Sequence, residues 1–193
     1  MRRFVELLNV TSTTSVLDVG GDLANWQLLP RHSRPRVTIL NVFGPRSSDE
    51  STGTAGWVIG DGRELPFPDR SFDVVFSNSV IEHVGELEDQ RRFAKEICRV
   101  GKRYFVQTPN RGFPIEPHLL TPGFQFLPRS AYRRLTRNCT VWGLLSRPSS
   151  SDAAAFAAAI RLLDRKALEG LFPGCTILSE RFLGLCKSLV AWR

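Results

Sequence analysis

The stretch "SVLDVGGD" at residues 15–22 indicates a buried strand that breaks into a tight turn. Its β-branched and aliphatic residues lead to Asp18, and Gly20 and Gly21 follow shortly after. A strand that is covered on both faces has such an apolar run, and glycines let a backbone approach a ligand closely. The stretch therefore predicts a central strand of a sheet, followed by a ligand-binding loop.

Three further apolar runs repeat this pattern along the chain. They are "RVTILNV" (36–42), "FDVVFSN" (72–78) and "RYFVQTP" (103–109), all rich in Val, Ile and Phe. The segments between them are long enough for crossover helices, and residues 87–100 place their apolar side chains near one helix face. The alternation of strands and helices predicts an α/β domain with a parallel sheet.

The texture of the sequence changes after Pro109. Residues 110–128 are rich in proline, phenylalanine and glycine, which predicts an ordered but irregular loop. Residues 147–163 combine a Ser/Asp cap with an alanine-rich helix, and a second short helix follows Asp164 as its N-cap. The chain then closes with two adjacent strands around Gly184, which predicts a hairpin at the sheet edge.

Length and composition bound the class of protein. A chain of 193 residues with 42% hydrophobic and 23% charged residues is typical of one soluble globular domain. No apolar run approaches the roughly 20 residues of a membrane-spanning helix, and the N-terminal apolar part is too short for a signal peptide. We expect a cytoplasmic protein. The four cysteines show no zinc-type spacing, so they are interpreted as buried free thiols.

The charge of the chain favours anionic partners. The net charge is +7 and the pI is near 9.8, and arginines are concentrated in "PRSAYRRLTRN" at 128–138. Nucleic acid, phosphorylated metabolites or an anionic membrane surface would each suit such a patch. The alternative is a basic helix face that only meets solvent.

Polar and glycine residues follow the predicted strands, where an open parallel sheet binds its ligands. Each of them is also an ordinary turn residue, but their joint spacing favours a site. They are Asp18, Gly20, Gly21, Asn41, Asp61, Gly62, Asn78 and Ser79.

The order "VLDVGG", "TILNV" and "GDGRELPFPDRSFDVVFSNSVIEHV" resembles the class I S-adenosylmethionine-dependent methyltransferases, in their type 11 branch. The signature of that branch runs almost complete from Leu65 to Val84, and the end of the chain also looks like the family's last helix and hairpin. The resemblance implies a Rossmann-like, seven-stranded, mostly parallel sheet with an antiparallel last strand and helices on both faces. It implies one domain over residues 1–193, with a substrate-side insertion around 110–150.

The resemblance also assigns roles toward S-adenosylmethionine. Asp18, Gly20 and Gly21 would surround its methionine part, and Asn41 stands where the family usually has an acid that binds the ribose hydroxyls. A carboxylate or an amide accepts from hydroxyl and amine donors, so these residue types suit those roles.

The later residues of the set would meet the other parts of the cofactor. Asp61 would accept from the adenine amine, and the Gly62 amide would face a ring nitrogen. Asn78 would lie beside the methionine end, near the transferred methyl group.

The loop departs from the family pattern of three spaced glycines, of which only Gly20 remains. Asp22 stands at the second position, where a left-handed backbone would cost about 1 kcal/mol. Ala24 stands at the third position, and Asn41 gives up the charge-assisted bond to the ribose. We expect a weakened but working cofactor site, with a vestigial site as the alternative.

Two histidines fall in segments expected near the acceptor. We predict that His83, Glu116 and His118 converge to polarise an acceptor hydroxyl, with a histidine as base. A divalent metal held by the same side chains is the less favoured hypothesis, so we predict no metal site. In the simplest alternative, Glu82 and His83 cap the next helix and "IEPH" orders the loop.

The insertion suggests the kind of acceptor. Four apolar side chains could line a pocket or anchor the loop, and the Arg129–Arg137 cluster could meet an anionic group. The apolar residues are Phe113, Phe124, Phe126 and Leu127. We expect O-methylation of a small-molecule or lipid-like acceptor that is anionic, with peripheral membrane contact compatible with the charge.

Three other classes of function account for parts of the sequence. RNA or protein methylation would use the basic charge, but "SNSV" after the fourth strand lacks the Asn/Asp-Pro-Pro-aromatic motif of base N-methylation, so nucleic acid is not favoured. A non-catalytic, partner-binding methyltransferase-like protein is the second class. A nicotinamide dehydrogenase explains the first loop only.

Overall fold

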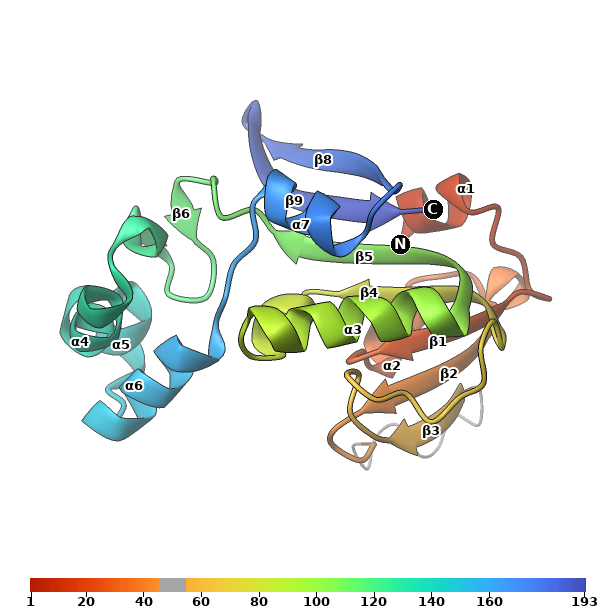
Figure 1. The fold of residues 1–193 in the computed structure, drawn as a ribbon, viewed down its shortest axis with the longest axis horizontal. Helices are drawn as coiled ribbons and strands as arrows, with labels where there is room; N and C mark the ends of the chain where they lie inside the picture. The colour runs from red at the N-terminus through yellow and green to blue at the C-terminus, as the bar shows by residue number, and fades with distance from the viewer. Residues whose placement is uncertain (46–54) are drawn as a thin grey trace.

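The computed structural model describes residues 1–45 and 55–193. Within these ranges one large sheet has seven strands in the order β3-β2-β1-β4-β5-β9-β8 (Figure 1). The strands are β1 (Ser15–Val19), β2 (Arg36–Asn41), β3 (Ala55–Ile59), β4 (Phe72–Asn78), β5 (Gly101–Pro109), β8 (Thr176–Phe182) and β9 (Leu185–Trp192).

The sheet confirms the predicted topology. β1 pairs in parallel with β2 and β4, and β2–β3 and β4–β5 are also parallel pairs. The last strand, β9, is antiparallel to both of its neighbours, β5 and β8. The chain runs outward from β1 to β3 and then crosses to β4 on the other side. The carboxyl end of β1 is therefore the topological switch point, where such sheets bind ligands.

Helices cover both faces of the sheet, as predicted (Figure 1). α3 (Leu87–Val100) and α7 (Arg165–Leu171) pack on one face, where their apolar side chains meet the inner residues of β1, β4 and β5. α1 (Arg2–Leu7) and α2 (Leu23–Gln27) pack on the other face. The amphipathic spacing of α3 and its capping box between Glu86 and Asp89 explain why this helix was predictable.

An aromatic cluster fills the core beneath α1 and α2. Phe4 packs edge-on against Phe76 at a ring-centroid distance of 4.8 Å, and against Trp26 at 5.9 Å. Phe105 stacks on Phe76 at 5.7 Å. These contacts hold α1 and α2 against β4 and β5.

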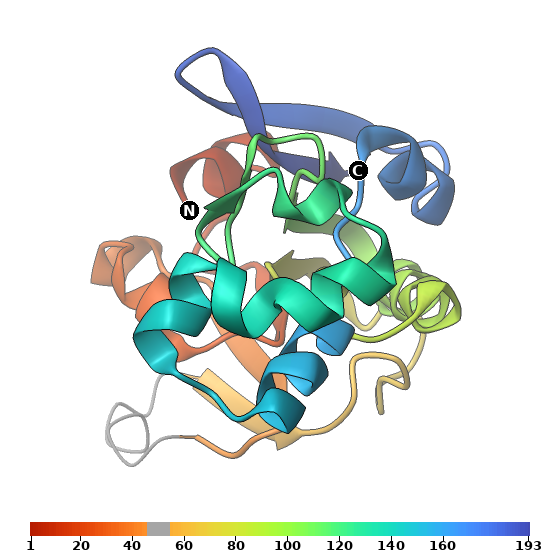
Figure 2. The ribbon, with the colours of Figure 1, turned by 90° about the vertical axis from the view of Figure 1, so that its left-hand side faces the viewer.

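Between β5 and α7 the chain forms a small lobe beyond the carboxyl ends of β4 and β5, which we call the helical lobe (Figures 1 and 2). It has its own apolar core around Leu119, Phe124, Tyr132 and Ala157. A parallel bridge joins Asn110 to Leu163, where the chain leaves for the lobe and returns. The lobe contains β6 (Ile115–Glu116), β7 (Thr121–Pro122), η4 (Phe124–Phe126), α4 (Arg129–Cys139), α5 (Val141–Ser146) and α6 (Ser150–Ala159). Outside the lobe, the chain forms two short 3-10 turns, η1 (Arg31–Ser33) and η3 (Ile81–His83).

The lobe is more regular than the sequence indicated. The segment 110–128, expected to be irregular, contains the β6–β7 pair and the turn η4. The helix predicted over 147–163 is confined to Ser150–Ala159. At the end of the chain the predicted hairpin is present, and Leu183 and Gly184 both have positive φ at its turn. Within the described ranges no helix combines the length and apolarity that crossing a bilayer requires.

Candidate functional site

A cavity of about 310 Å³ lies at the carboxyl ends of β1, β2, β3 and β4, and we call it the switch-point pocket. Four of the seven residues predicted to bind a cofactor line it, namely Gly20, Asn41, Asp61 and Gly62. Ser79, expected beside Asn78 at the end of the fourth strand, lines the wall, and so does Arg63, which sequence reasoning missed. His83, predicted on the acceptor side, also lines the cavity.

Two of the wall positions require glycine for steric reasons. Gly20 has a φ of +77°, and a Cβ there would lie 2.6 Å from the Val80 side chain. A Cβ on Gly62 would lie 2.6 Å from the Phe93 ring and 2.8 Å from Val19. Any side chain at these positions would collide with the core, so the bare backbone forms the wall.

Asn41 joins the ends of β1 and β2. Its Nδ2 donates to the Gly21 carbonyl oxygen at 3.0 Å, and its Oδ1 accepts from the Phe43 amide at 3.4 Å. A Cβ on Gly21 would lie 2.0 Å from the Asp18 carboxylate. The loop after β1 is therefore packed too tightly for a side chain at position 21.

Asp18 supports this loop from within the core and does not line the pocket. Its side chain is fully buried, and its Oδ2 accepts from Trp26 Nε1 at 2.7 Å. Its Oδ1 finds no partner among the described residues. Burial raises the pKa of Asp18 to about 7, which the Trp26 hydrogen bond partly opposes and the Asp22 charge reinforces. Trp26 is a residue that sequence reasoning missed.

The prediction of a strained, left-handed backbone at Asp22 is wrong. Asp22 has a φ of −143° and a ψ of 175°, an extended conformation that any residue adopts. Its carboxylate accepts from the Ala24 amide at 2.9 Å and so caps the N-terminus of α2. Asp22, at the second position of the glycine pattern, therefore caps α2, and Ala24 lies in the first turn of that helix without strain.

Asp61 is engaged by Arg63 in this structure. Arg63 Nε lies 3.0 Å and 2.9 Å from the two carboxylate oxygens, and Nη2 lies 2.6 Å from Oδ2. Arg63 Nη1 also reaches Asp89 Oδ1 of α3 at 3.1 Å. The hydrogen bonds from Arg63 hold the pKa of Asp61 below its ordinary value. A ligand amine at Asp61 would have to share the carboxylate with this guanidinium or displace it.

The carboxyl end of β4 places Ser79, rather than Asn78, in the pocket wall. Asn78 is exposed and pairs in register with Gln107 of β5, but it does not line the cavity. Ser79 has a φ of +56°, and its Oγ donates to Gln107 Oε1 at 3.0 Å. This left-handed residue turns the chain away from the sheet toward His83.

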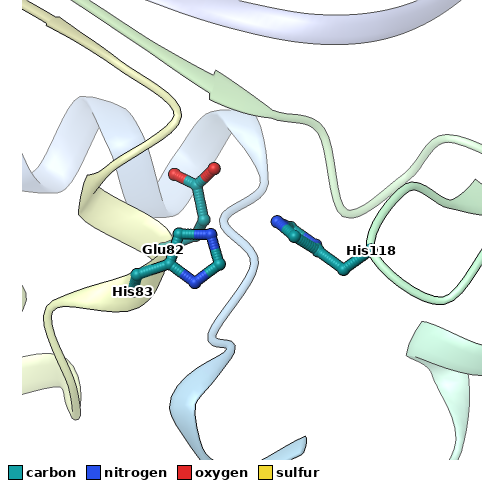
Figure 3. Close-up of side chains that lie close together, drawn as sticks. All are labelled: Glu82, His83 and His118. Atoms are coloured by element: carbon teal, nitrogen blue, oxygen red, sulfur yellow. The ribbon is translucent and has the colours of Figure 1, made fainter. Parts of the chain in front are cut away.

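Two of the predicted acceptor-side residues, His83 and His118, lie close together with Glu82 as an additional member (Figure 3). His118 Nδ1 lies 2.8 Å from Glu116 Oε1, and the His83 and His118 rings meet edge-on at 4.7 Å between centroids. Ligand atoms of Glu82, His83 and His118 lie within 4.8 Å of one another. We call these four residues the acid–histidine cluster.

Burial controls the charges in this cluster. It lowers the pKa of His83 to about 4, with the nearby His118 charge acting in the same direction, so His83 is neutral at pH 7. Burial also raises the pKa of Glu82. Glu82 Oε2 accepts from Thr108 Oγ1 at 2.9 Å, whereas Oε1 has no partner among the described residues. The sequence indicated a helix cap at Glu82, and its position beside His83 was the only signal of another role.

Comparisons with known proteins agree with this geometry. Residues 36–104 match the family model described as a methyltransferase domain. A probable S-adenosylmethionine-dependent methyltransferase of Mycolicibacterium smegmatis is 49% identical over 55 residues, which are 27% of this chain and 20% of that protein. An uncharacterized protein of Mycobacterium tuberculosis is 36% identical over 56 residues, which are 29% of this chain and 19% of that protein. The chain thus spans about a fifth of the length of these curated relatives.

Solved structures share the fold at low identity. A S-adenosylmethionine-dependent methyltransferase from Aquifex aeolicus has a TM-score of 0.54 and 12% identity, with coverage of 99% of this chain and 87% of that chain. The Burkholderia thailandensis 1,6-didemethyltoxoflavin-N1-methyltransferase, solved with S-adenosylhomocysteine, has a TM-score of 0.60 and 13% identity, with coverage of 99% and 74%. The match to the methyltransferase-domain model over residues 36–104 and the seven-stranded sheet together support the resemblance to the class I S-adenosylmethionine-dependent methyltransferases of the type 11 branch.

Proposed function

We propose that this chain transfers a methyl group from S-adenosylmethionine to an oxygen atom of a small-molecule or lipid-like acceptor. The observation that carries the proposal is the position of His83, which lines the switch-point pocket and also contacts His118 of the helical lobe. His118, the proposed proton acceptor, therefore contacts a residue of the cavity wall at the switch point.

The residues of the switch-point pocket fit the cofactor. Asn41 and Asp61 offer oxygen acceptors at the ends of β2 and β3, suited to ribose hydroxyls and an adenine amine. The bare backbone at Gly20 and Gly62 lets a ligand approach closely. When bound, S-adenosylmethionine supplies an electrophilic methyl group, which leaves its sulfonium sulfur as the bond to the acceptor oxygen forms.

The acid–histidine cluster would take the acceptor's proton. The Glu116 carboxylate accepts from His118 Nδ1, so the lone pair of that ring is on Nε2. Nε2 would accept the hydroxyl proton, and Glu116 would stabilise the imidazolium that forms. His83 would orient the hydroxyl, because its lowered pKa of about 4 makes it a poor proton acceptor.

One observation favours a second function, that of a partner-binding protein without methyl transfer. Both carboxylate oxygens of Asp61 already accept from Arg63. If this ion pair excludes the adenine amine, the pocket retains its shape but not its affinity. Cofactor binding therefore separates the two functions.

Calorimetric titration with S-adenosylmethionine and S-adenosylhomocysteine tests cofactor binding. We expect Asp61→Ala to raise the Kd about tenfold or more, because a hydrogen bond to a charged group is lost. Asp69→Ala is the matched control, since Asp69 carries the same charge nearby but pairs with Arg99 outside the pocket. Absence of binding at about 1 mM cofactor would refute the proposal and support the partner-binding function.

Turnover tests the acid–histidine cluster. With an acceptor found by screening alcohols and phenols for S-adenosylhomocysteine release, His118→Ala should lower kcat by about 10²–10⁴-fold. The Kd for the cofactor should stay unchanged. His32→Ala is the control, because His32 is an exposed residue of η1. Unchanged kcat in His118→Ala would remove this histidine from the mechanism.

A further inference from the structure

A second, larger cavity of about 670 Å³ lies between the helical lobe and the helices α3 and α7. It shares no lining residue with the switch-point pocket. We call it the basic cavity, because six cationic side chains line it, namely Arg91, Arg111, Arg129, Arg133, Arg161 and Lys166.

The acids near the basic cavity do not balance its cations. Arg129 and Arg161 share a single carboxylate, that of Glu86, at 2.7 Å and 3.1 Å. Arg91 pairs with Glu88 at 3.2 Å. Because Arg129 and Arg161 carry two positive charges and Glu86 only one negative charge, one positive charge remains that a bound anion can neutralise.

Three of the cations have no acidic partner. Among the described residues, Arg111, Arg133 and Lys166 form no ion pair. Arg111 follows the end of β5, Arg133 belongs to α4, and Lys166 belongs to α7. Asp164 also lines the cavity, but its Oδ1 accepts from the Ala167 amide and caps α7. Convergence of unpaired cations from three separate elements favours a multivalent anion over a single carboxylate.

The cavity also presents an acceptor without a donor. Gln125 is 8% exposed and lines the cavity, and its Nε2 donates to the Phe113 carbonyl oxygen. Its Oε1 has no partner among the described residues. A buried amide oxygen is costly to leave unpaired, so it calls for a ligand or solvent donor such as a hydroxyl group.

We propose that the basic cavity binds a phosphate ester of a polyol, such as a sugar phosphate. The phosphate would meet Arg111, Arg133 and Lys166, and a ligand hydroxyl would donate to Gln125 Oε1. The apolar wall, which includes Leu163, suits the carbon face of a sugar ring. This binding does not depend on methyl transfer, because the two cavities have separate walls.

Calorimetric titration of the whole chain with glucose 1-phosphate tests the proposal, with glucose, inorganic pyrophosphate and dodecyl phosphate as comparison probes. Arg133→Glu and Arg134→Glu form a matched pair, because both residues are exposed neighbours on α4 and only Arg133 lines the cavity. Both substitutions change the net charge equally. We expect Arg133→Glu to weaken glucose 1-phosphate binding about tenfold or more, and Arg134→Glu by less than about twofold.

The outcomes are distinct. Glucose 1-phosphate binding that is tighter than that of glucose and dodecyl phosphate, and is lost in Arg133→Glu alone, supports the sugar-phosphate site. Equal weakening by the two variants would show a diffuse charge effect and overturn the proposal. Tighter binding of dodecyl phosphate would overturn the sugar assignment in favour of a lipid phosphate. Binding of S-adenosylmethionine is measured separately, so failure here leaves the proposed methyl transfer untouched.

Discussion

We expect the wild-type chain to lose stability between about pH 4 and pH 7, and we expect Asp18→Asn to remove this decline. The carboxyl group is fully buried beside Trp26, and its pKa in the folded chain is about 7 against an ordinary value of 3.8. Between these values the unfolded chain has released this proton while the folded chain retains it. The unfolded state therefore binds fewer protons, and the free energy of unfolding falls as pH rises.

The size of this effect follows from the pKa difference. A rise from 3.8 to about 7 corresponds to about 4 kcal/mol, at about 1.36 kcal/mol for each pH unit. The contribution is fully favourable below pH 4 and is lost by about pH 7. Asparagine has nearly the same shape and no proton to release, so its contribution stays constant over this range.

Urea denaturation at several pH values from 4 to 8 measures the difference between the two proteins. Other titrating groups are common to both, so their effects cancel in the comparison. Asp69→Asn serves as control, because the Asp69 side chain is 74% exposed. Unfolding free energies that stay parallel within about 1 kcal/mol for wild type and Asp18→Asn would refute the assigned burial of this carboxyl group.

Substitutions at three further positions probe the switch-point pocket and the packing that supports it. Trp26→Phe leaves Asp18 without its donor and should lower the free energy of unfolding by about 1–3 kcal/mol, as measured by urea denaturation. Gly62→Ala places a methyl group against Phe93 and should lower it by about 1–3 kcal/mol, with a matching drop in Tm. Asp22→Ala removes the cap of α2 and should cost about 1 kcal/mol, whereas Asp22→Asn should cost less because an amide oxygen also caps.

Much of the sheet could be predicted because its strands are marked by continuous apolar runs. β4 has the predicted bounds, and β1 lies within the stretch 15–22 that predicted a strand followed by a turn. α3 was equally predictable, since five buried residues repeat along one face. The strands are buried on both faces and α3 is buried along one stripe, so the spacing of their apolar residues directly indicates which side chains are buried.

The helical lobe was harder to predict because its helices bury little. α4 buries only Tyr132 and Thr136 among eleven residues, and the arginines between them give no apolar period. Thr136 satisfies its own hydroxyl by donating to the Tyr132 carbonyl oxygen. The segment therefore resembled a solvated basic stretch, although its position forms one wall of the basic cavity.

The candidate site shows the same division. Gly20 and Gly62 could be placed from their position after strands, because that geometry is local. The pairing of Asp61 with Arg63 and the burial of Glu82 depend on α3 and on β5. Local sequence patterns do not predict such contacts, because the partners lie far apart in the sequence.

The bridge between Asn110 and Leu163 makes the helical lobe a closed excursion from the sheet. The Arg111 amide donates to the Leu163 carbonyl oxygen at 2.9 Å, so the two ends of the excursion are hydrogen-bonded to each other. A short turn could span that gap, and the seven strands would keep their order without the lobe. The helical lobe is thus attached to the sheet at two adjacent points of the chain, and it interrupts no strand.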